Sequence, residues 1–244
     1  IMFMDFITLA MDQIVNHAAK IHYIYGGQLN VPITIRTPAG AGRGYGASHS
    51  QSLESWFINV PGLKVIAPSN PYSAKGTLKS AIIDQNPVLF IENKMLYDIT
   101  QEIPDSPYYL EIGKAEKVID GNDVTIISYG RMLHLSMEAA MIARDNGTSI
   151  ELIDLVSLKP LDEDLIIDSV KKTGRVIIVE EGHKTSGIGA EISAIIAENC
   201  LEYLNGRIIR VATEDAPIPS STTLEKAVLP DVGKIIEAIK KSFF

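Results

Sequence analysis

Cysteine is almost absent from this chain of 244 residues, in which Cys200 is the single one. One cysteine excludes an internal disulfide and agrees with a reducing compartment. Cys200 falls within the helical pattern of residues 187–204, where we expect a small, buried core residue. The apolar content of 46% and the charged content of 21% are typical of a soluble globular protein with a sizeable core.

Positive charge is also in short supply, because the net charge is −8 and no basic stripe occurs. This balance argues against nucleic acid as a partner. The apolar start of the chain, residues 1–11, has no basic residue and carries Asp5 in its middle. It therefore fits neither a signal peptide nor a membrane span, and we expect no membrane partner.

Several catalytic signatures are missing as well. The sequence has no Walker phosphate-binding loop and no Gly-x-Ser-x-Gly nucleophile elbow. The histidines show no metal-ligand spacing, and their best pair, His17 and His22, is one position away from an i,i+4 pair. The other three histidines are His49, His134 and His183.

Apolar runs and helical periods alternate along the chain. In the first half we expect strands at 32–37, 63–68 and 87–92, and helices at 9–25, 51–58 and 71–83. In the second half we expect strands at 123–128, 149–155, 175–180 and 207–211, and helices at 132–146, 162–172, 187–204 and 232–244. Short βα units with continuous Val, Ile and Leu strands predict parallel sheets covered on both faces. The predicted fold class is α/β, with two doubly wound domains.

A linker is predicted where the alternation stops. Residues 99–111 contain two prolines and no periodic pattern. We place a first domain over 1–100, the linker over 101–111 and a second domain over 112–244. The apolar start, residues 1–11, is interpreted as a buried strand with no turn before it, so we expect the first domain to be truncated at its N-terminus.

The loop at residues 39–51 is the most informative stretch. It follows a strand, contains four glycines at positions 40, 42, 44 and 46, and carries His49. Glycines let a backbone approach a ligand closely, and α/β enzymes often keep a titratable imidazole beyond a parallel strand. A solvent loop with a structural histidine is the alternative interpretation.

Three features of the second half also have two interpretations. The glycine-rich run Gly187–Glu191 opens a helix, where it either binds an anion or allows close helix packing, the latter being commoner. Glu180 and Glu181 end a strand as paired acids or, more commonly, as solvated edge carboxylates. His134 and His183 each lie just beyond a strand end, where ligands approach such sheets.

Short motifs along the whole chain together resemble one family. They are Phe-Met-Asp-Phe at 3–6, Asp-Gln-Ile at 12–14, Pro-Ile-Thr-Ile-Arg-Thr-Pro at 32–38, His-Ser-Gln-Ser at 49–52, Pro-Gly-Leu-Lys-Val at 61–65, Asp-Gln-Asn-Pro at 84–87 and Gly-Ile-Gly-Ala-Glu at 187–191. The family is the beta subunit of the thiamine-diphosphate-dependent, decarboxylating component of 2-oxo-acid dehydrogenase complexes. Its members include the pyruvate, branched-chain 2-oxo-acid and acetoin enzymes.

The resemblance implies a pyrimidine-binding, transketolase-like domain followed by a transketolase C-terminal domain, with the linker at the boundary. It also implies thiamine diphosphate bound between an alpha and a beta subunit, with the diphosphate and its Mg²⁺ held by the alpha subunit. Phe6 then matches the residue that packs on the aminopyrimidine, with Met2 nearby. His49 matches the active-site histidine that faces the thiazolium and the substrate, where an imidazole suits proton transfer.

A structural potassium site is a second implication, because some members hold K⁺ with backbone carbonyls. The matching positions are Ile33, Ala81, Ile82, Asp84 and Asn86. A plain Asx-type turn at 84–86 explains the same residues equally well.

One departure concerns the family's glutamate that activates the cofactor through the pyrimidine ring. The matching position lies upstream of the first residue, and neither Glu54 nor Glu92 stands in its motif. From this comparison we expect no decarboxylase activity from this chain alone. Native-level turnover by this chain with an alpha subunit would contradict that expectation.

The expected partners are the alpha subunit, a second beta subunit in a heterotetramer, and the dihydrolipoyl acyltransferase core. The function implied is oxidative decarboxylation of pyruvate or a related 2-oxo acid, with reductive acylation of lipoyl groups. An acetoin dehydrogenase beta subunit and a domain that acts mainly in assembly are the alternatives. The compartment is the cytoplasm in a bacterium, or the mitochondrial matrix or plastid in a eukaryote.

Overall fold

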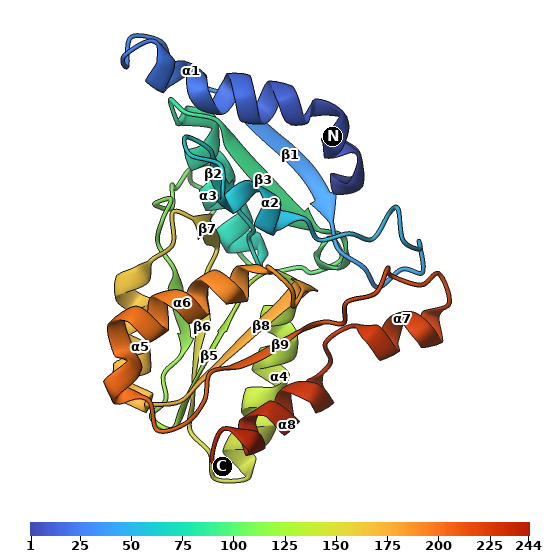
Figure 1. Ribbon diagram of the computed structural model, residues 1–244, viewed down its shortest axis with the longest axis vertical. Helices are drawn as coiled ribbons and strands as arrows, with labels where there is room; N and C mark the ends of the chain where they lie inside the picture. Colours follow the sequence, from blue (N-terminus) through green and yellow to red (C-terminus); the bar gives the residue numbers. More distant parts are fainter.

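The computed structural model describes residues 1–244 and contains two β-sheets, one above the other in Figure 1. The upper sheet has the order β1-β3-β2-β7. Its strands are β1 (Thr34–Ala39), β2 (Lys64–Ile66), β3 (Val88–Asn93) and β7 (Ser157–Lys159). The first three are parallel, whereas β7 comes from the second half of the chain and pairs antiparallel with β2.

The lower sheet has the order β4-β6-β5-β8-β9. Its strands are β4 (Glu116–Ile119), β5 (Val124–Ser128), β6 (Ile150–Asp154), β8 (Val176–His183) and β9 (Ile209–Thr213). All neighbours are parallel except β4, which runs antiparallel to β6. The α/β class is confirmed, but the expectation of purely parallel sheets is wrong at the edge strands β4 and β7.

The start of the chain is helical, so the strand predicted at 1–11 is wrong. A 3-10 helix, Met4–Ala10, continues through a π-helical stretch, Gln13–Ala18, into α1 (Ala19–Ile24). Its buried side chains Met4, Ile7, Ile14 and Ala18 are spaced by three, four or seven residues, which is the period of a helix rather than the alternation of a strand.

The remaining helices largely follow the predicted pattern. They are α2 (Glu54–Ile58), α3 (Pro71–Ile83), η3 (Lys94–Leu96), α4 (Arg131–Asp145), α5 (Glu163–Thr173), α6 (Ile188–Cys200), η4 (Leu201–Tyr203), α7 (Thr222–Val228) and α8 (Val232–Lys241). The α3 helix begins where predicted, because the Asn70 side chain and Ser73 form a capping box around Pro71. None of these helices combines the length and the apolar character that crossing a membrane requires.

The two sheets share one apolar core of 26 buried residues. It includes Val65 and Leu89 of the upper sheet and Ile127 and Ile178 of the lower sheet, all nearly or fully buried. Cys200 belongs to the same core and is fully buried, as predicted. The halves of the chain are therefore joined by packed apolar side chains and by β7, not only by the extended connection after η3.

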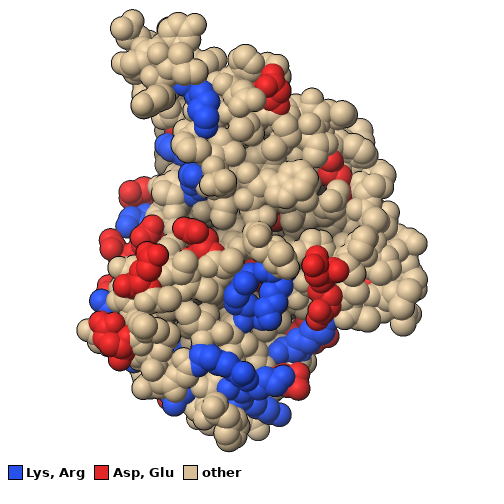
Figure 2. All heavy atoms as spheres, viewed as in Figure 1, with Lys and Arg blue, Asp and Glu red and all other residues tan.

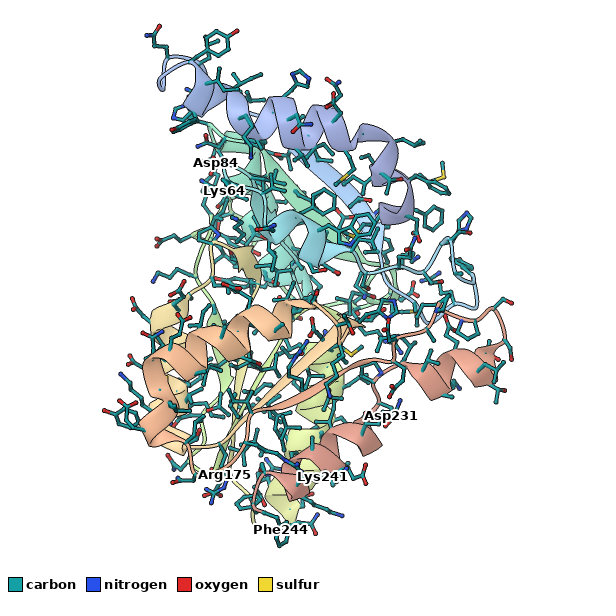
Figure 3. The ribbon with its side chains drawn as sticks, in the orientation of Figure 1. Lys64, Asp84, Arg175, Asp231, Lys241 and Phe244 are labelled. Atoms are coloured by element: carbon teal, nitrogen blue, oxygen red, sulfur yellow. The ribbon has the colours of Figure 1, made fainter.

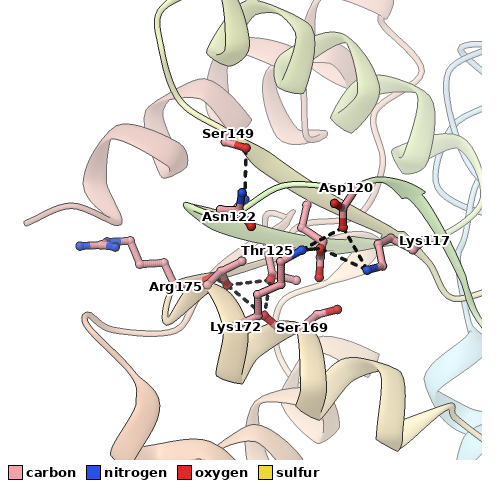
Figure 4. Close-up of polar contacts among 10 residues, drawn as sticks. Lys117, Asp120, Asn122, Thr125, Ser149, Ser169, Lys172 and Arg175 are labelled. Atoms are coloured by element: carbon pink, nitrogen blue, oxygen red, sulfur yellow. Dashed lines mark hydrogen bonds and ion pairs between the residues drawn. The ribbon is translucent and has the colours of Figure 1, made fainter.

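Ion pairs connect β4, β6 and α5 at the edge of the lower sheet, and Figure 4 shows them. The fully buried carboxylate of Glu151 accepts a hydrogen bond from Lys172 and lies 3.5 Å from the Lys117 ammonium. The two lysines also bond Asp120 and hold the pKa of that carboxyl well below its usual value. Figure 2 shows charged side chains gathered over this second half, while the surface over the first half is mostly uncharged on that face.

Candidate functional site

Phe6 and His49, which were predicted to share a site, lie side by side. Their ring centroids are 5.2 Å apart and their planes cross at 80°, so an edge of one ring meets the face of the other. Phe3 approaches His49 in the same way from 5.1 Å, and Tyr45 lies 6.2 Å from Phe3. The start of the chain and the glycine-rich loop thus build a cluster of four rings, in which Phe3 and Phe6 meet the imidazole and Tyr45 meets Phe3.

This aromatic cluster is open on one side. Phe6 is 41% exposed, and Met2, in the extended residues before the helix, is 79% exposed. Met2 directly precedes Phe3 of the cluster, and its side chain is exposed to solvent. Sequence reasoning missed Phe3 and Tyr45, although the first stands in the same motif as Phe6 and the second in the glycine-rich loop.

The backbone of His49 is held from two sides. Its N–H donates to the carbonyl of Gly46 at 3.3 Å, and its own carbonyl accepts a hydrogen bond from the Lys94 ammonium. Its ring Nδ1 lies 3.1 Å from the Ser48 hydroxyl, while Nε2 has no hydrogen-bond partner in the chain. The imidazole therefore keeps one nitrogen available for a ligand.

Lys94 is an unexpected member of this site, because its side chain is only 5% exposed. Its Nζ lies 4.8 Å from the centre of the Phe3 ring and 5.4 Å from that of Tyr45, which places the ammonium over both aromatic faces. Burial lowers the pKa of Lys94, and the neighbouring carboxylates Asp5 and Glu181 oppose that shift.

The base of the loop is closed by backbone and side-chain hydrogen bonds. The N–H of Gly40 donates to the carbonyl of Gln51 at 3.2 Å, so the two ends of the loop meet. The carboxylate of Asp5 accepts from the backbone N–H of Gln51 at 3.1 Å and from its side-chain amide at 3.0 Å. These bonds tie the loop to the N-terminal helix that carries Phe6.

Glu181 is buried at the boundary between the two halves, so the interpretation of a solvated edge carboxylate is wrong for it. It is 6% exposed and accepts hydrogen bonds from the N–H of Ala41 at 2.6 Å and from the side-chain amide of Asn93 at 2.9 Å. Glu54 is buried close by, and burial raises its pKa to about 8, with smaller contributions from Glu181 and Glu180.

Glu180 is buried as well, at the glycine-rich start of α6. The N–H of Gly189 donates to its carboxylate at 3.1 Å, and Arg210 lies 3.3 Å from the same oxygen. A Cβ at Gly187 would come within 2.6 Å of Glu180 Oε2. The glycines of this run therefore allow close packing, as the commoner interpretation held, and the anion at the helix N-terminus is a carboxylate of the chain itself.

The two histidines beyond strand ends make structural hydrogen bonds. The Nε2 atom of His134 lies 2.6 Å from the carbonyl oxygen of Ser69, and the Nδ1 atom of His183 lies 2.8 Å from that of Glu214. Each imidazole thus joins two chain segments. Neither makes a ring contact with the aromatic cluster, although His183 lines a cavity with Ala47 and Gln51 of the glycine-rich loop.

The two glutamates that match no cofactor motif are also engaged elsewhere. Glu92 accepts hydrogen bonds from Arg36 at 2.5 Å and from the Tyr97 hydroxyl at 2.6 Å. Glu54 is buried at the domain boundary. Neither carboxylate forms part of the aromatic cluster.

Two of the backbone carbonyls predicted for a cation site already accept hydrogen bonds within the chain. The N–H of Val88 donates to the Ile33 carbonyl at 3.0 Å, and the N–H of Asp84 donates to the Ala81 carbonyl at 3.3 Å. Ile82 lies in the last turn of α3 and is 61% exposed.

Asp84 forms the Asx-type turn that was the alternative interpretation. Its Oδ1 accepts the N–H of Asn86 at 2.9 Å, and its other oxygen pairs with the ammonium of Lys64 (Figure 3). A metal ion here would rely on backbone carbonyls, because a lysine already balances the carboxylate.

Comparison with known proteins first defines the class. Residues 1–100 match the pyrimidine binding domain of transketolase, and residues 113–235 match the transketolase C-terminal domain. A solved structure described as an inactive β4 tetramer of a split-gene transketolase superposes on 99% of this chain and 74% of its own, with a TM-score of 0.80 and 22% sequence identity. The chain has the transketolase-like fold of thiamine-diphosphate-dependent enzymes.

Sequence relatives define the family within that class. The beta subunit of the pyruvate dehydrogenase E1 component from Gracilaria tenuistipitata var. liui is 49% identical over 97% of this chain and 73% of its own length. The corresponding subunit from Porphyra purpurea is 48% identical over 97% of this chain and 72% of its own. The beta subunit of acetoin:2,6-dichlorophenolindophenol oxidoreductase from Bacillus subtilis is 42% identical over 97% of this chain and 69% of its own. This chain belongs to the family of beta subunits of 2-oxo-acid dehydrogenase E1 components, and the predicted resemblance is confirmed.

Proposed function

We propose that this chain supplies the aminopyrimidine side of a thiamine diphosphate site in an enzyme that oxidatively decarboxylates pyruvate. The observation that carries the proposal is the open aromatic cluster of Phe3, Phe6 and His49, built by the two segments that the family motifs select. A flat heteroaromatic ring stacks favourably on such a surface. The arrangement therefore fits the cofactor that the family uses.

The residues of the cluster have separate tasks. Thiamine diphosphate, when bound, supplies the electron sink for decarboxylation. The half-exposed ring of Phe6 packs on the pyrimidine, and the free side chain of Met2 covers its edge. The Nε2 atom of His49 faces the reaction zone and holds or moves a proton, while Ser48 orients the ring through Nδ1.

Pyruvate is the substrate we favour over acetoin. The relatives named for pyruvate dehydrogenase are 49% and 48% identical to this chain, whereas the one named for acetoin is 42% identical. Turnover assays against pyruvate, acetoin and branched 2-oxo acids test this choice, in an enzyme assembled from an alpha subunit and a full-length beta chain that carries the upstream glutamate. Preference for acetoin or for a branched acid would overturn the substrate, but not the role of the aromatic cluster.

The partners follow from the same assignment. An alpha subunit holds the diphosphate and Mg²⁺, a second beta subunit completes a heterotetramer, and the dihydrolipoyl acyltransferase core receives the acyl group. Large apolar side chains lie exposed on the N-terminal helix, with Leu9 at 89% and Tyr23 at 88%, and Trp56 on α2 is 49% exposed. Burying such side chains against another subunit is favourable, which supports the assembly.

Two substitutions test the site in the same assembled enzyme, with the full-length beta chain. Phe6→Ala removes the stacking surface, so thiamine diphosphate should bind at least about tenfold more weakly in a calorimetric titration. His49→Ala removes the proton-transfer group and should lower kcat by about 10²- to 10⁴-fold. His17→Ala is the matched control, since His17 is a largely exposed histidine on the same helical segment and should change neither value. Unchanged cofactor affinity and unchanged kcat in the two site variants would refute the assignment.

We also propose that the turn at 84–86 binds K⁺ through backbone carbonyls. Its support is the hydrogen bond from the N–H of Val31 to the carbonyl of Gln85 at 3.1 Å, which holds the segment before β1 against this turn. Thermal unfolding measured in KCl and in NaCl of equal strength tests this, because an ion that binds only the folded state raises its stability. Equal melting temperatures over a wide range of K⁺ concentrations would leave only the Asx-type turn.

A further inference from the structure

Two carboxylates from the second half of the chain accept hydrogen bonds from backbone N–H groups of the glycine-rich loop. Glu225, on α7, accepts hydrogen bonds from the N–H of Gly42 at 2.8 Å and from the N–H of Gly44 at 3.1 Å. Glu181, on β8, accepts the N–H of Ala41 at 2.6 Å. Glu225 is 2% exposed, so its carboxylate is shielded from water. Hydrogen bonds from N–H groups to a buried carboxylate are among the stronger ones in proteins.

The loop can present these N–H groups only because of its glycines. Gly42 and Gly44 have φ values of +104° and +68°, which side chains rarely adopt. A Cβ at Gly42 would also lie 2.8 Å from the guanidinium of Arg131, and one at Gly44 would lie 3.1 Å from the carbonyl of Ser220. The loop therefore rests closely against α4 at Gly42 and against the segment that leads to α7 at Gly44.

A small apolar cluster packs residues that flank α7 against the loop. Ala41 of the loop packs with Ile218 and Leu229, which flank α7, and these three buried residues form a cluster separate from the main core. Figure 1 shows α7 projecting to one side of the lower sheet, with the loop after β1 lying beside the chain that leads to it. This projecting segment thus contacts the loop through apolar side chains as well as through Glu225.

We infer that Glu225 is a positioning residue for His49 and that residues 218–229 act as a bracket that fixes the glycine-rich loop. The inference rests on the proposed role of His49. Two N–H groups two residues apart bind the two oxygens of one carboxylate, which fixes both the place and the tilt of the loop. His49 lies five residues after Gly44 on the same loop, so its ring meets Phe3 and Phe6 only while the loop is held.

Two readouts report the loop without any turnover. Trypsin can cut after Arg43, which lies between the two bonded glycines and is exposed. Proteolysis of a segment follows the population of its open form, so Glu225→Ala should raise the cleavage rate there about tenfold or more, and Glu225→Gln by a smaller factor. Diethyl pyrocarbonate should likewise modify His49 several-fold faster in Glu225→Ala, with His17 in the same molecule as the reference.

The control is Glu198→Gln, which removes the same charge from an exposed position on α6. It should leave both readouts at the wild-type level. Circular dichroism should show one melting transition for each variant, within a few degrees of wild type, because the residues that flank α7 belong to a small cluster separate from the main core. If Glu225→Ala fails to fold, Glu225→Gln carries the test, since its amide keeps one acceptor and loses the other.

Turnover in the assembled alpha–beta enzyme then separates the inference from the proposed function. We expect Glu225→Ala to lower kcat at least tenfold with little change in the KM for pyruvate. Unchanged cleavage at Arg43 and unchanged modification of His49 would overturn the inference whatever the activity. The inference would also be overturned if Glu225→Ala loosened the loop but kept full kcat, while His49→Ala abolished turnover. Full turnover in His49→Ala would instead overturn the proposed function.

Discussion

The carboxylate of Asp5 accepts both hydrogen bonds that Gln51 can donate toward it, from the backbone N–H at 3.1 Å and from the side-chain amide at 3.0 Å. The two residues stand 46 positions apart, one on the N-terminal helix and the other at the end of the glycine-rich loop. Asp5 is 7% exposed, so this contact is shielded from water. It joins the residue before Phe6 to the residue two positions after His49.

Loss of the Gln51 side chain should therefore weaken the fold. Gln51→Ala removes a hydrogen bond to a buried carboxylate, and the free energy of unfolding should fall by about 1–3 kcal/mol. Urea unfolding at neutral pH measures the change. Gln28→Ala is the control, because Gln28 is exposed and its side chain makes no hydrogen bond. Equal effects of the two substitutions would show that Asp5 and Gln51 contribute nothing together.

Glu54 should make stability depend on pH. Its folded-state pKa, raised by burial to about 8, lies above that of an exposed glutamate, so the folded state holds the proton more tightly than the unfolded state. The contribution of Glu54 to stability is thus complete at acid pH and is lost as the pH rises from about 4.5 to about 8.

Glu54→Gln should remove this dependence and leave the protein more stable than wild type at pH 9. The difference between the two proteins should grow by about 1.4 kcal/mol per pH unit across that range. Glu180 and Glu181 face the same region and titrate in both proteins, so their effects largely cancel in the difference. A difference that stays flat from pH 5 to pH 9 in urea titrations would refute the prediction.

Ser69 should matter most at high pH. Its hydroxyl donates to the carboxylate of Asp154 at 2.7 Å, across the boundary between the two halves. Burial raises the pKa of Asp154 to about 7, and the bond from Ser69 opposes that shift. Ser69→Ala should therefore raise this pKa further, and it should cost about 1–3 kcal/mol above pH 8 and less below pH 6.

Unfolding curves at pH 5.5 and pH 8.5 measure the two costs. Ser221→Ala is the control, because Ser221 is exposed and its side chain makes no capping hydrogen bond. A cost of Ser69→Ala that is equal at both pH values would contradict the assignment of the ionised carboxylate as the acceptor.

Alanine substitutions at Gly62 and Gly147 should separate the cost of a left-handed backbone from the cost of a steric clash. Their φ values are +88° and +83°, but a Cβ at Gly62 would lie 2.0 Å from the carbonyl oxygen of Ala19, whereas a Cβ at Gly147 would meet nothing within 4 Å. Gly147→Ala should cost about 1–2 kcal/mol from the left-handed backbone alone. Gly62→Ala should cost several kcal/mol more, because it also pushes the turn away from α1.

Thermal unfolding of the two alanine variants, with wild type as the reference, measures both costs. Equal melting temperatures for the two variants would mean that the turn at Gly62 moves freely and does not anchor the N-terminal helix.

The sequence alone predicts much of the fold through periodicity. The strands β5, β6 and β8 are rich in Val, Ile and Leu, and α3 begins at a Pro next to a capping Asn, so local patterns were sufficient there. The start of the chain was assigned to a strand because short apolar runs are ambiguous between strand and helix. The segments β4, β7 and α7 were missed, since three to seven residues carry little periodic signal.

By itself the sequence determined the α/β class, the family, and the choice of Phe6 and His49, because these depend on local periods and on short motifs. Tertiary structure alone decided what holds His49 in place. Lys94, Glu181 and Glu225 are distant from the loop in the sequence. The local sequence around a charged residue does not show whether its side chain will be solvated or buried against the backbone. Their partners are N–H and carbonyl groups, which every residue has, so only the folded backbone shows which ones they bind.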